Sequence, residues 1–490
     1  MTALREAEVD YVIIGTGAGG ATAARVLAEA GRSLLMLEEG PDLRAVERPR
    51  AVREAMRQSF RDGGAQTTHD RHPLPVLQGR LVGGSTAINS GIVWRLPPTV
   101  QRQWAREHGL EELVDPRVLD PIFARLEAEL GVGETPEAER GSNAALLAEG
   151  AAALGLVGKP ITRNVRDCAG SARCLPGCPR GARPSMDVSY VPFALARGAS
   201  LWALARAEHI TVRGRRATAV TGSLLHPERR TPIGSFHVRA RRGVIVAAGA
   251  VHTPLLLRAA GLRGLVGQRF QAHPGAAVLG RFDRKVTQGV GATQAYEVPL
   301  PERGMKLESL SLPPELLAAR MPGVGPDWQG RLAALGQYAH WVAMVRMNAQ
   351  GRVRPGLLGR ARIEYAPTRE DLARVRDGIA LLCRLLFAAG AREVSHGIFG
   401  LPPLLTHPDQ VARIDDLTLT TDRIHLLASH LFGTACAGAD PRTSVVGPRL
   451  ESHEIAGLYV MDASVFPTNL GVNPQHSIMA LAFRAAEQLS

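Results

Sequence analysis

Cysteines, aromatic side chains and long apolar runs are all scarce in this sequence. The five cysteines are an odd number, which argues against a disulfide framework. Aromatic residues form only 4% of the chain and no basic patch interleaves with them, so we expect no nucleic-acid partner. No uncharged run reaches the length of a membrane-spanning helix; the nearest, from Gly378 to Gly390, is interrupted by Arg384.

Lysine is also rare. Only three of the 58 basic residues are lysines, namely Lys159, Lys285 and Lys306. Arginine therefore supplies most of the net charge of +12, and the arginines are scattered along the chain instead of forming a tail or a stripe. This pattern predicts at most a peripheral association with an anionic membrane surface. Residues 1–10 lack the apolar core and cleavage site of a secretory signal, so we expect a cytoplasmic protein.

The composition is that of a folded protein with more than one domain. Hydrophobic residues form 45% and charged residues 21% of the chain, which is enough apolar surface for extensive cores. A chain of 490 residues is too long for one ordinary core, so we expect two interwoven domains. The 52 glycines are typical of a protein with many tight turns and close backbone approaches to a ligand.

The N-terminal region has the pattern of a strand, a glycine turn, a helix and a second strand. The letters YVII at residues 11–14 predict a short apolar strand that runs into glycines. Residues 21–30 contain strong helix formers and are followed by Gly31, which predicts a helix that ends there. A second strand is expected over residues 33–37. This order is typical of the start of a dinucleotide-binding sheet.

The glycines of this turn have the spacing of a dinucleotide-binding motif. Gly15 permits a tight turn, Gly17 lets the backbone approach a pyrophosphate, and Gly20 permits close packing of helix on strand. Glu38 follows the second strand, where an acidic side chain accepts hydrogen bonds from a ribose hydroxyl. The alternative is a glycine-rich turn with a surface glutamate. The motif fits NAD as well as FAD, since both contain an ADP half.

The middle of the chain again predicts strands. Residues 209–212 and 217–221 alternate in polarity, and the uncharged run 243–249 suits a strand buried on both faces. A helix is expected directly afterwards, with Thr253 as its cap and Pro254 in its first turn.

Three further segments resemble the signatures of the glucose-methanol-choline (GMC) oxidoreductases. GRLVGGSTAIN at residues 79–89 resembles the first signature, and GAVHTPLLLRAAGL at residues 249–262 resembles the second. Three C-terminal segments together resemble the third conserved block of the family: HLFGT at 430–434, MDASVFP at 461–467 and GVNPQ at 471–475. The matches span nearly the whole chain in the order of the family, so the chain is identified as a member of it.

The resemblance implies an α/β fold in which a Rossmann-like FAD-binding domain is interwoven with a substrate domain built on an antiparallel sheet with helices. We place the FAD-binding domain at residues 1–269, with an inserted cysteine-bearing segment at 150–195. The substrate-binding domain is placed at 270–425, where the pattern changes to short irregular segments rich in proline. Residues 426–490 return to the FAD-binding domain and carry the catalytic residues.

The same resemblance implies that the cofactor is FAD. In members with covalent flavin a histidine of the first signature forms the tether, and here its place is taken by Ile88 or Asn89, so we expect non-covalent FAD. The residues expected to contact FAD are Gly15, Gly17, Gly20, Glu38, Gly83, Gly84, Ser85, Asn89, Asp462, Ala463, Asn473 and Pro474.

Carried over from the family, His430 is the base that takes the hydroxyl proton of an alcohol, and Asn473 positions the substrate oxygen. The alternatives are a structural histidine and an asparagine that merely caps the helix expected from Pro474.

The N-terminus of that helix is expected to stabilise negative charge on reduced flavin. His476 in its first turn is expected to support the site from behind. The electron acceptor stays open between dioxygen, a quinone and a protein.

A cysteine-bearing segment contains Cys168, Cys174 and Cys178, which are either structural or ligands of an iron-sulfur cluster. The stretch around Cys174 and Cys178 resembles the long-chain alcohol oxidase and bacterial dehydrogenase branch. That branch implies a long-chain or steroid-like alcohol as substrate. Other functions on this fold are a cyanohydrin lyase with redox-silent FAD, an iron-sulfur FAD dehydrogenase and a non-catalytic flavin-binding scaffold.

Overall fold

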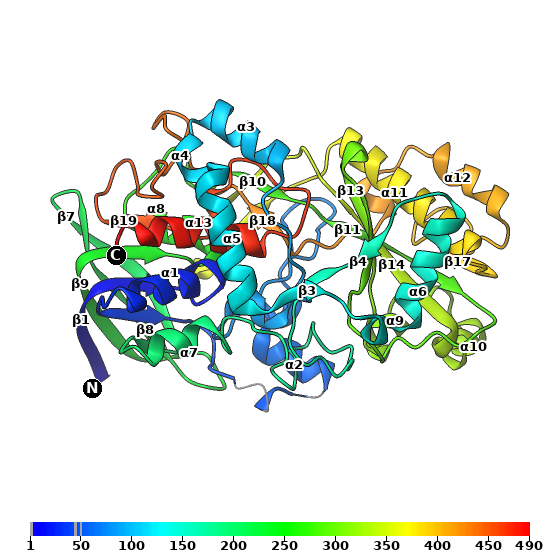
Figure 1. The fold of residues 1–490 in the computed structure, drawn as a ribbon, viewed down its shortest axis with the longest axis horizontal. Helices are drawn as coiled ribbons and strands as arrows, with labels where there is room; N and C mark the ends of the chain where they lie inside the picture. Colours follow the sequence, from blue (N-terminus) through cyan, green and yellow to red (C-terminus); the bar gives the residue numbers. More distant parts are fainter. Residues whose placement is uncertain (1–2, 44–46, 50) are drawn as a thin grey trace.

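Two large β-sheets organise the chain in the computed structural model, which describes residues 3–43, 47–49 and 51–490. Figure 1 shows a mixed seven-stranded sheet on the left and an antiparallel six-stranded sheet on the right. Separate hydrophobic cores pack against the two sheets. The mixed α/β architecture predicted from the sequence is confirmed.

The seven-stranded sheet is mainly parallel. Its order is β6 (Ser200–Trp202), β2 (Leu34–Leu37), β1 (Ala3–Ile14), β9 (Pro232–Val246), β8 (Arg216–Leu225) and β7 (Ala205–Arg213), with β19 (Leu458–Val460) also paired to β9. β8 pairs antiparallel with the first part of β9, whereas β19 pairs parallel with its last residues, 244–246. The last strand of this sheet therefore comes from the C-terminal end of the chain.

The expected strand, turn, helix and strand are present at the N-terminus, with different ends. α1 spans Ala18–Glu29, so it begins earlier than the helix expected from residue 21. β1 begins at Ala3, because residues 3–9 pair with residues 234–240 of β9. The side chain of Leu4 in this part is 59% exposed. Backbone hydrogen bonds rather than burial hold this part of the strand, which explains why hydrophobic patterning did not reveal it.

Helix α8 (Gly249–Ala259) begins four residues before the expected cap, so the interpretation of Thr253 as its N-cap is wrong. Pro254 therefore lies inside the helix, where it cannot donate a hydrogen bond to the carbonyl of Ala250. The hydroxyl of Thr434 donates to that carbonyl instead, at 2.6 Å. A side chain from the C-terminal block thus completes the backbone hydrogen bonding of α8 and makes the buried proline tolerable.

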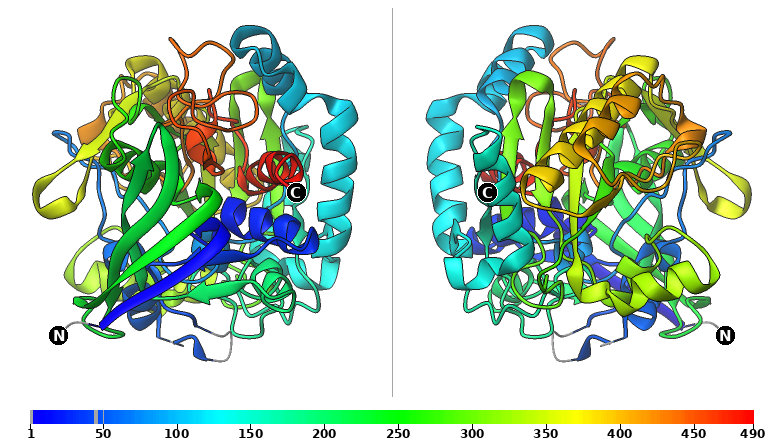
Figure 2. Two further views of the ribbon diagram at one scale, coloured as in Figure 1. Left: turned by 90° about the vertical axis from the view of Figure 1, so that its left-hand side faces the viewer. Right: turned by 90° about the vertical axis from the view of Figure 1, so that its right-hand side faces the viewer.

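Helices cover one face of the seven-stranded sheet. α1 packs against α7 (Tyr190–Leu195) and α13 (Gln475–Glu487), and α13 packs against α5 (Pro116–Leu130). The left view of Figure 2 shows α1 in blue, α13 in red and α5 in cyan on the same side of the strands. Segments from the beginning and the end of the chain are therefore direct neighbours in the fold.

The six-stranded sheet is antiparallel throughout. Its order is β17 (Glu393–Ser395), β11 (Gly275–Arg281), β14 (Tyr338–Val345), β13 (Met305–Ser309), β12 (Tyr296–Leu300) and β4 (Lys159–Pro160). The long helix α11 (Arg369–Ala388) packs on β14 and β11 and also contacts α6 (Glu137–Ala153). Within the described residues, none of the helices has the length and apolar character needed to cross a membrane.

Two small sheets and shorter elements complete the fold. One small sheet has the order β16 (Ala361–Glu364), β15 (Gly351–Pro355), β10 (Gln268–Ala272) and β18 (Leu431–Phe432). The other pairs β3 (Val132–Glu134) with β5 (Thr162–Asn164). The remaining α-helices are α2 (Val52–Ser59), α3 (Pro98–His108), α4 (Glu111–Val114), α9 (Pro314–Ala318), α10 (Gly325–Ala333) and α12 (Ala412–Asp415). Among the 3-10 turns, η3 (Gly84–Ile88) and η9 (Ala463–Val465) border the candidate site.

Candidate active site

A cavity of about 1690 Å³ is lined by residues of both large sheets. Its walls include the glycine turn before α1, the segment around η3, the residue before β18 and the loop before α13. Typical ligand sites have volumes of about 300–1,000 Å³. The cavity therefore has room for a large cofactor together with a second molecule.

The three glycines of the turn before α1 occupy different environments. Gly15 has a φ of +98°, and a Cβ at this position would lie 2.3 Å from the carbonyl oxygen of Ala247. A Cβ at Gly20 would lie 2.0 Å from the carbonyl oxygen of Gly15. Gly17 lines the cavity, precedes the first turn of α1, and leaves a Cβ with no atom within 4 Å. The open space beside Gly17 and the positive end of α1 suit an anionic ligand.

Glu38 lies at the end of β2 with its carboxylate held in place. Oε2 accepts hydrogen bonds from the Thr16 amide at 3.2 Å and hydroxyl at 2.8 Å, and Oε1 accepts from the Gly40 amide at 2.9 Å. The side chain is buried, lines the cavity, and has its pKa raised by burial. The alternative of a surface glutamate is therefore wrong.

A second glycine pair packs directly on this turn. Gly83 has a φ of +92° and its amide donates to the Thr16 hydroxyl at 3.0 Å. Gly84 has a φ of +53°, and a Cβ here would lie 3.0 Å from Gly17 Cα. A further glycine, Gly19, was not singled out from the sequence, although a Cβ there would lie 1.7 Å from the Met461 carbonyl oxygen. That requirement comes from Met461, which directly follows β19 (Leu458–Val460) far along the chain, so the local sequence gave no signal for it.

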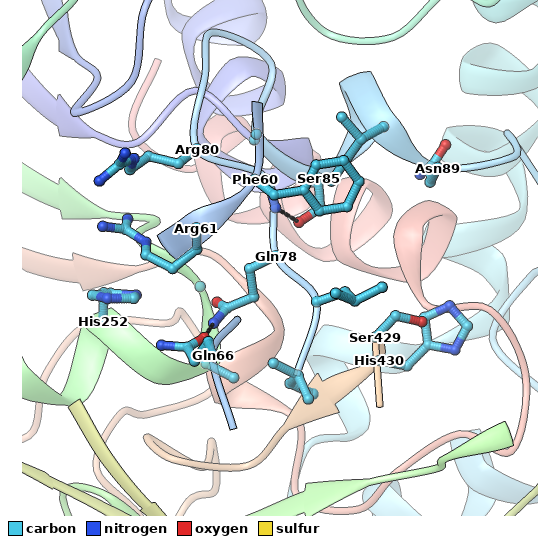
Figure 3. Close-up of a pocket in the computed structure, with 18 of the residues that line it drawn as sticks. Phe60, Arg61, Gln66, Gln78, Arg80, Ser85, Asn89, His252, Ser429 and His430 are labelled. Carbon is cyan, nitrogen blue, oxygen red and sulfur yellow. Dashed lines mark hydrogen bonds between the residues drawn. The ribbon is translucent and has the colours of Figure 1, made fainter. Parts of the chain in front are cut away.

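Ser85 and Asn89 follow on the same segment and line the cavity (Figure 3). The Ser85 hydroxyl accepts a hydrogen bond from the Gly79 amide at 3.0 Å. The side-chain Nδ2 of Asn89 donates a hydrogen bond to Gln475 Oε1, at the start of α13, at 2.5 Å. These contacts tie the η3 segment to the C-terminal helix.

Cationic side chains gather beside a second glutamate on the cavity wall. Glu39 lies 2.7 Å from Arg61 and 3.9 Å from Arg80, and Figure 3 shows both arginines with His252. Burial works against the Glu39 carboxylate, but Arg61, His252 and Arg80 together outweigh it and lower the pKa. Burial and Arg61 lower the pKa of His252 to about 3, so this histidine is neutral at physiological pH. The sequence analysis did not identify this group.

Asp462 connects the C-terminal block to α8. Its Oδ2 accepts from the Gly249 amide at 2.9 Å and the Thr253 hydroxyl at 2.5 Å, and its Oδ1 accepts from the Ser464 amide at 2.8 Å. Burial raises the pKa of this carboxyl group. Asp462 and the adjacent Ala463 both line the cavity. The carboxylate thus fixes the backbone of two segments where they border the cavity.

His430 and Asn473 lie side by side on the cavity wall. Asn473 Nδ2 is 3.4 Å from His430 Nε2, so one oxygen atom can contact both groups. Helix α13 begins at Gln475, its N-cap is Pro474, and its cap has no side-chain hydrogen bond. The interpretation of Asn473 as a helix cap is therefore wrong, because its side chain points to other partners.

The environment of His430 favours the neutral imidazole. Burial and the nearby Lys306 ammonium lower the pKa of His430 to about 3. His273 lies against it with ring centroids 4.6 Å apart, and burial lowers the pKa of His273 well below its usual value. Within the described residues, neither ring nitrogen of His273 nor Nδ1 of His430 has a hydrogen-bond partner. Sequence reasoning identified neither His273 nor Lys306, because their partners are distant in sequence.

Beyond His430 the cavity continues along the six-stranded sheet. The apolar residues on this wall are Ala277, Leu310, Leu312, Leu316, Val342 and Met344. Polar groups on the same side include Glu308 and His340. A ligand in this part of the cavity would contact a mainly apolar wall with a few polar groups.

His476 lies in the first turn of α13 but away from the pair. It is buried, with its ring against Phe123 and its Nε2 3.4 Å from Glu127 Oε1. Burial lowers its pKa. These contacts are those of a side chain that anchors α13 from behind.

The cysteine-bearing segment borders the cavity through Leu175 and Pro176. The Sγ of Cys174 accepts a hydrogen bond from Arg163 at 3.3 Å. Burial works against a Cys174 thiolate, but Arg163 and Arg183 outweigh it and lower the pKa. Across the described part of the chain, no group of three or more His, Cys, Asp or Glu residues is arranged to hold a metal ion.

Comparisons with known proteins relate the chain to one family. An N-terminal family profile described as GMC oxidoreductase matches residues 56–275, and a C-terminal profile with the same description matches residues 345–482. A GMC-type oxidoreductase of Mycobacterium tuberculosis is 37% identical over 98% of this chain and 75% of that protein. A long-chain-alcohol oxidase of Arabidopsis thaliana is 27% identical over 99% of this chain and 67% of that protein.

A solved structure shows the same fold. The formate oxidase of Aspergillus oryzae, whose structure was determined to study modification of its FAD, has a TM-score of 0.76 to this chain. The match covers 99% of both chains at 18% sequence identity. At this identity the likeness concerns the fold alone.

Proposed function

The chain belongs to the GMC oxidoreductase family, and from this premise we propose that it oxidises the CH–OH group of an alcohol to a carbonyl with FAD. One observation carries the proposal. His430 and Asn473 present polar atoms 3.4 Å apart to the same cavity that the glycine turn borders. A base and a hydrogen-bond donor at one point are what an alcohol oxygen needs when it becomes a carbonyl oxygen.

The residues of the glycine turn fit FAD, the cofactor that the family implies. Gly17 leaves room for a phosphate at the N-terminus of α1, and Glu38 keeps a held carboxylate on the cavity wall for a ribose hydroxyl. Arg61 and Arg80 add positive charge to the same wall. We propose non-covalent binding, because the segment Gly84–Ile88 contains no histidine, cysteine or tyrosine to form a tether.

When bound, FAD supplies the acceptor for the hydride that leaves the alcohol carbon. His430 Nε2 takes the hydroxyl proton, and its low pKa keeps the imidazole neutral and ready to accept it. Asn473 Nδ2 donates a hydrogen bond to the same oxygen, which stabilises negative charge on it while the carbonyl forms. The alcohol thereby loses its hydroxyl proton to His430 and one hydride to the cofactor, and the low pKa of His430 lets the imidazole pass the proton on to solvent.

The substrate we propose is an alcohol with a long apolar body. The wall beyond His430 is formed mainly by leucine, valine and methionine side chains, which suits an aliphatic chain or a steroid-like ring system. The 27% identity to a long-chain-alcohol oxidase agrees with this class. We propose dioxygen, a quinone or a protein as the acceptor of the electrons.

Anaerobic mixing of the FAD-loaded protein with alcohols tests this function. We expect primary alcohols of increasing chain length to bleach the visible flavin absorption. The rate of this bleaching should depend on His430. Admitting air afterwards, or adding a quinone, identifies the acceptor by the return of the colour. Cleavage of a cyanohydrin without any bleaching by alcohols would overturn the proposal in favour of a lyase.

A further inference from the structure

A buried ammonium group lies behind the catalytic pair. Lys306 on β13 is 2% exposed, and its Nζ lies 3.0 Å from Glu297 Oε2 and 2.5 Å from Glu308 Oε1. Both carboxylates are almost completely buried. A lysine in such a place costs desolvation energy and is seldom found without partners or a function.

The strand register explains how the three charges meet. Lys306 and Glu308 are two residues apart on β13, so they share one face of the sheet. Glu297 on β12 lies directly opposite Glu308. Two carboxylates opposite each other repel. Lys306 is the diagonal neighbour of Glu297 across the two strands, and its Nζ contacts both carboxylates. Burial opposes the ammonium form, but the carboxylates of Glu308 and Glu297 outweigh it and raise the pKa of Lys306.

The third contact of Lys306 reaches the active site. Its Nζ donates a hydrogen bond to Asn473 Oδ1 at 2.6 Å. An ammonium group can only donate, so the atom that faces it must be the amide oxygen and not the amide nitrogen. The NH₂ group of Asn473 is thereby turned to the opposite side, where it lies 3.4 Å from His430 Nε2.

We propose that Lys306 is a positioning residue, which holds the Asn473 amide so that its NH₂ group faces His430 and the substrate oxygen. The inference rests on the proposed function for its catalytic consequence. It explains why a charge is kept in this interior, since a free asparagine could present either end of its amide to the substrate. An amide oxygen in that place would repel the developing negative charge that the NH₂ group stabilises.

A kinetic double-mutant cycle tests this role. The paired substitution Lys306→Met and Glu308→Gln removes one charge of each sign from the cluster. It is introduced into the wild-type protein and into the Asn473→Ala variant, and all proteins are loaded with FAD. In the wild type we expect the rate of flavin reduction at saturating alcohol to fall about tenfold to a hundredfold, as for a misplaced donor. In Asn473→Ala the same pair of changes should alter the rate by no more than about twofold, because its effect passes through the missing amide.

Lys159→Met is the matched control. Lys159 lies 3.7 Å from the other oxygen of Glu297 and is 44% exposed, and the structure gives it no contact with Asn473. We expect its removal to leave the rate of flavin reduction within about twofold of wild type. Equal losses in both backgrounds of the cycle, or an equal loss in Lys159→Met, would refute the positioning role. If the Met and Gln pair does not fold, Lys306→Arg is measured in the same two backgrounds with the same criterion.

A crystal structure of the FAD-loaded Lys306→Met, Glu308→Gln protein gives a readout that needs no turnover. We expect the Asn473 side chain to leave its position beside His430 or to turn its oxygen towards it. An unchanged amide with its hydrogen-bond pattern intact would overturn the inference. If no alcohol reduces the flavin of the wild-type protein, the proposed function fails, and this comparison still decides whether Lys306 holds Asn473.

Discussion

Replacing Gly17 by alanine tests our proposal that this glycine serves FAD binding and not folding. Gly17 has a φ of −70° and a ψ of −166°, which alanine adopts readily, and its Cβ would meet no atom within 4 Å. We therefore expect the free energy of unfolding of the apoprotein to change by less than about 1 kcal/mol. The new methyl group instead occupies space next to the helix N-terminus, where we place a phosphate of FAD.

The matched control is Gly19→Ala, two residues further on in the first turn of α1. Its Cβ would lie 1.7 Å from the Met461 carbonyl oxygen, so backbone must move to admit it. Overpacking of this kind costs about 1–3 kcal/mol, and we expect the apoprotein to lose this much stability. Gly17→Ala should instead weaken FAD binding by at least about tenfold, which equals about 1.4 kcal/mol.

Two measurements compare these variants. Urea unfolding of the apoproteins gives the folding effect, and titration with FAD followed by quenching of flavin fluorescence gives the binding effect. Since FAD binds only the folded chain, a weaker affinity also reduces the thermal stabilisation by added FAD. Wild-type affinity for FAD in Gly17→Ala would refute the placement of a phosphate beside this glycine.

Three further predictions concern His430 and Thr434. Replacing His430 by glutamine should slow flavin reduction by alcohol about 10²- to 10⁴-fold in anaerobic stopped flow; a smaller change than tenfold would exclude it as the base. Because burial and Lys306 lower the pKa of His430 to about 3, the imidazole stays neutral well below its usual pKa. The rate of flavin reduction should therefore stay constant from about pH 8 down to about pH 5, and a loss near pH 6.5 would contradict the shift. Replacing Thr434 by valine removes the donor to the Ala250 carbonyl and should lower the free energy of unfolding by about 1–3 kcal/mol in urea, with no change counting against that role.

The parts of the site that depend on local sequence could be predicted. The spacing of Gly15, Gly17 and Gly20 and the acid at Glu38 indicate a dinucleotide turn because each requirement is met within one short unit. The family blocks placed His430 and Asn473 in the same candidate site. In the structure, Asn473 Nδ2 lies 3.4 Å from His430 Nε2. The roles of these residues stay predictions until they are tested.

The parts that depend on contacts between distant segments could not be predicted. Lys306 contacts an amide 167 residues away, and its own strand gives no sign of that partner. Thr253 has the sequence of a helix cap, but its hydroxyl is bound to Asp462, which is 209 residues away. Pro254 has the sequence of a helix start but lies inside α8, where the Thr434 hydroxyl donates to the Ala250 carbonyl that the proline cannot reach. Local propensity fails at these positions because tertiary hydrogen bonds decide them.

The pairing of β19 with β9 has a consequence for the order in which the protein is made. Residues 244–246 of β9 are completely buried, and residues 458–460 of β19 pair with the edge that β1 does not cover. On the ribosome, residues 247–457 are added after this apolar edge is synthesised and before its partner strand exists. An uncovered strand of this kind is prone to pairing with other chains, so a nascent or truncated protein lacking β19 is exposed to aggregation. Asn473 follows β19 within the same late segment, so the cavity wall and the cover of this edge are completed at nearly the same stage of synthesis.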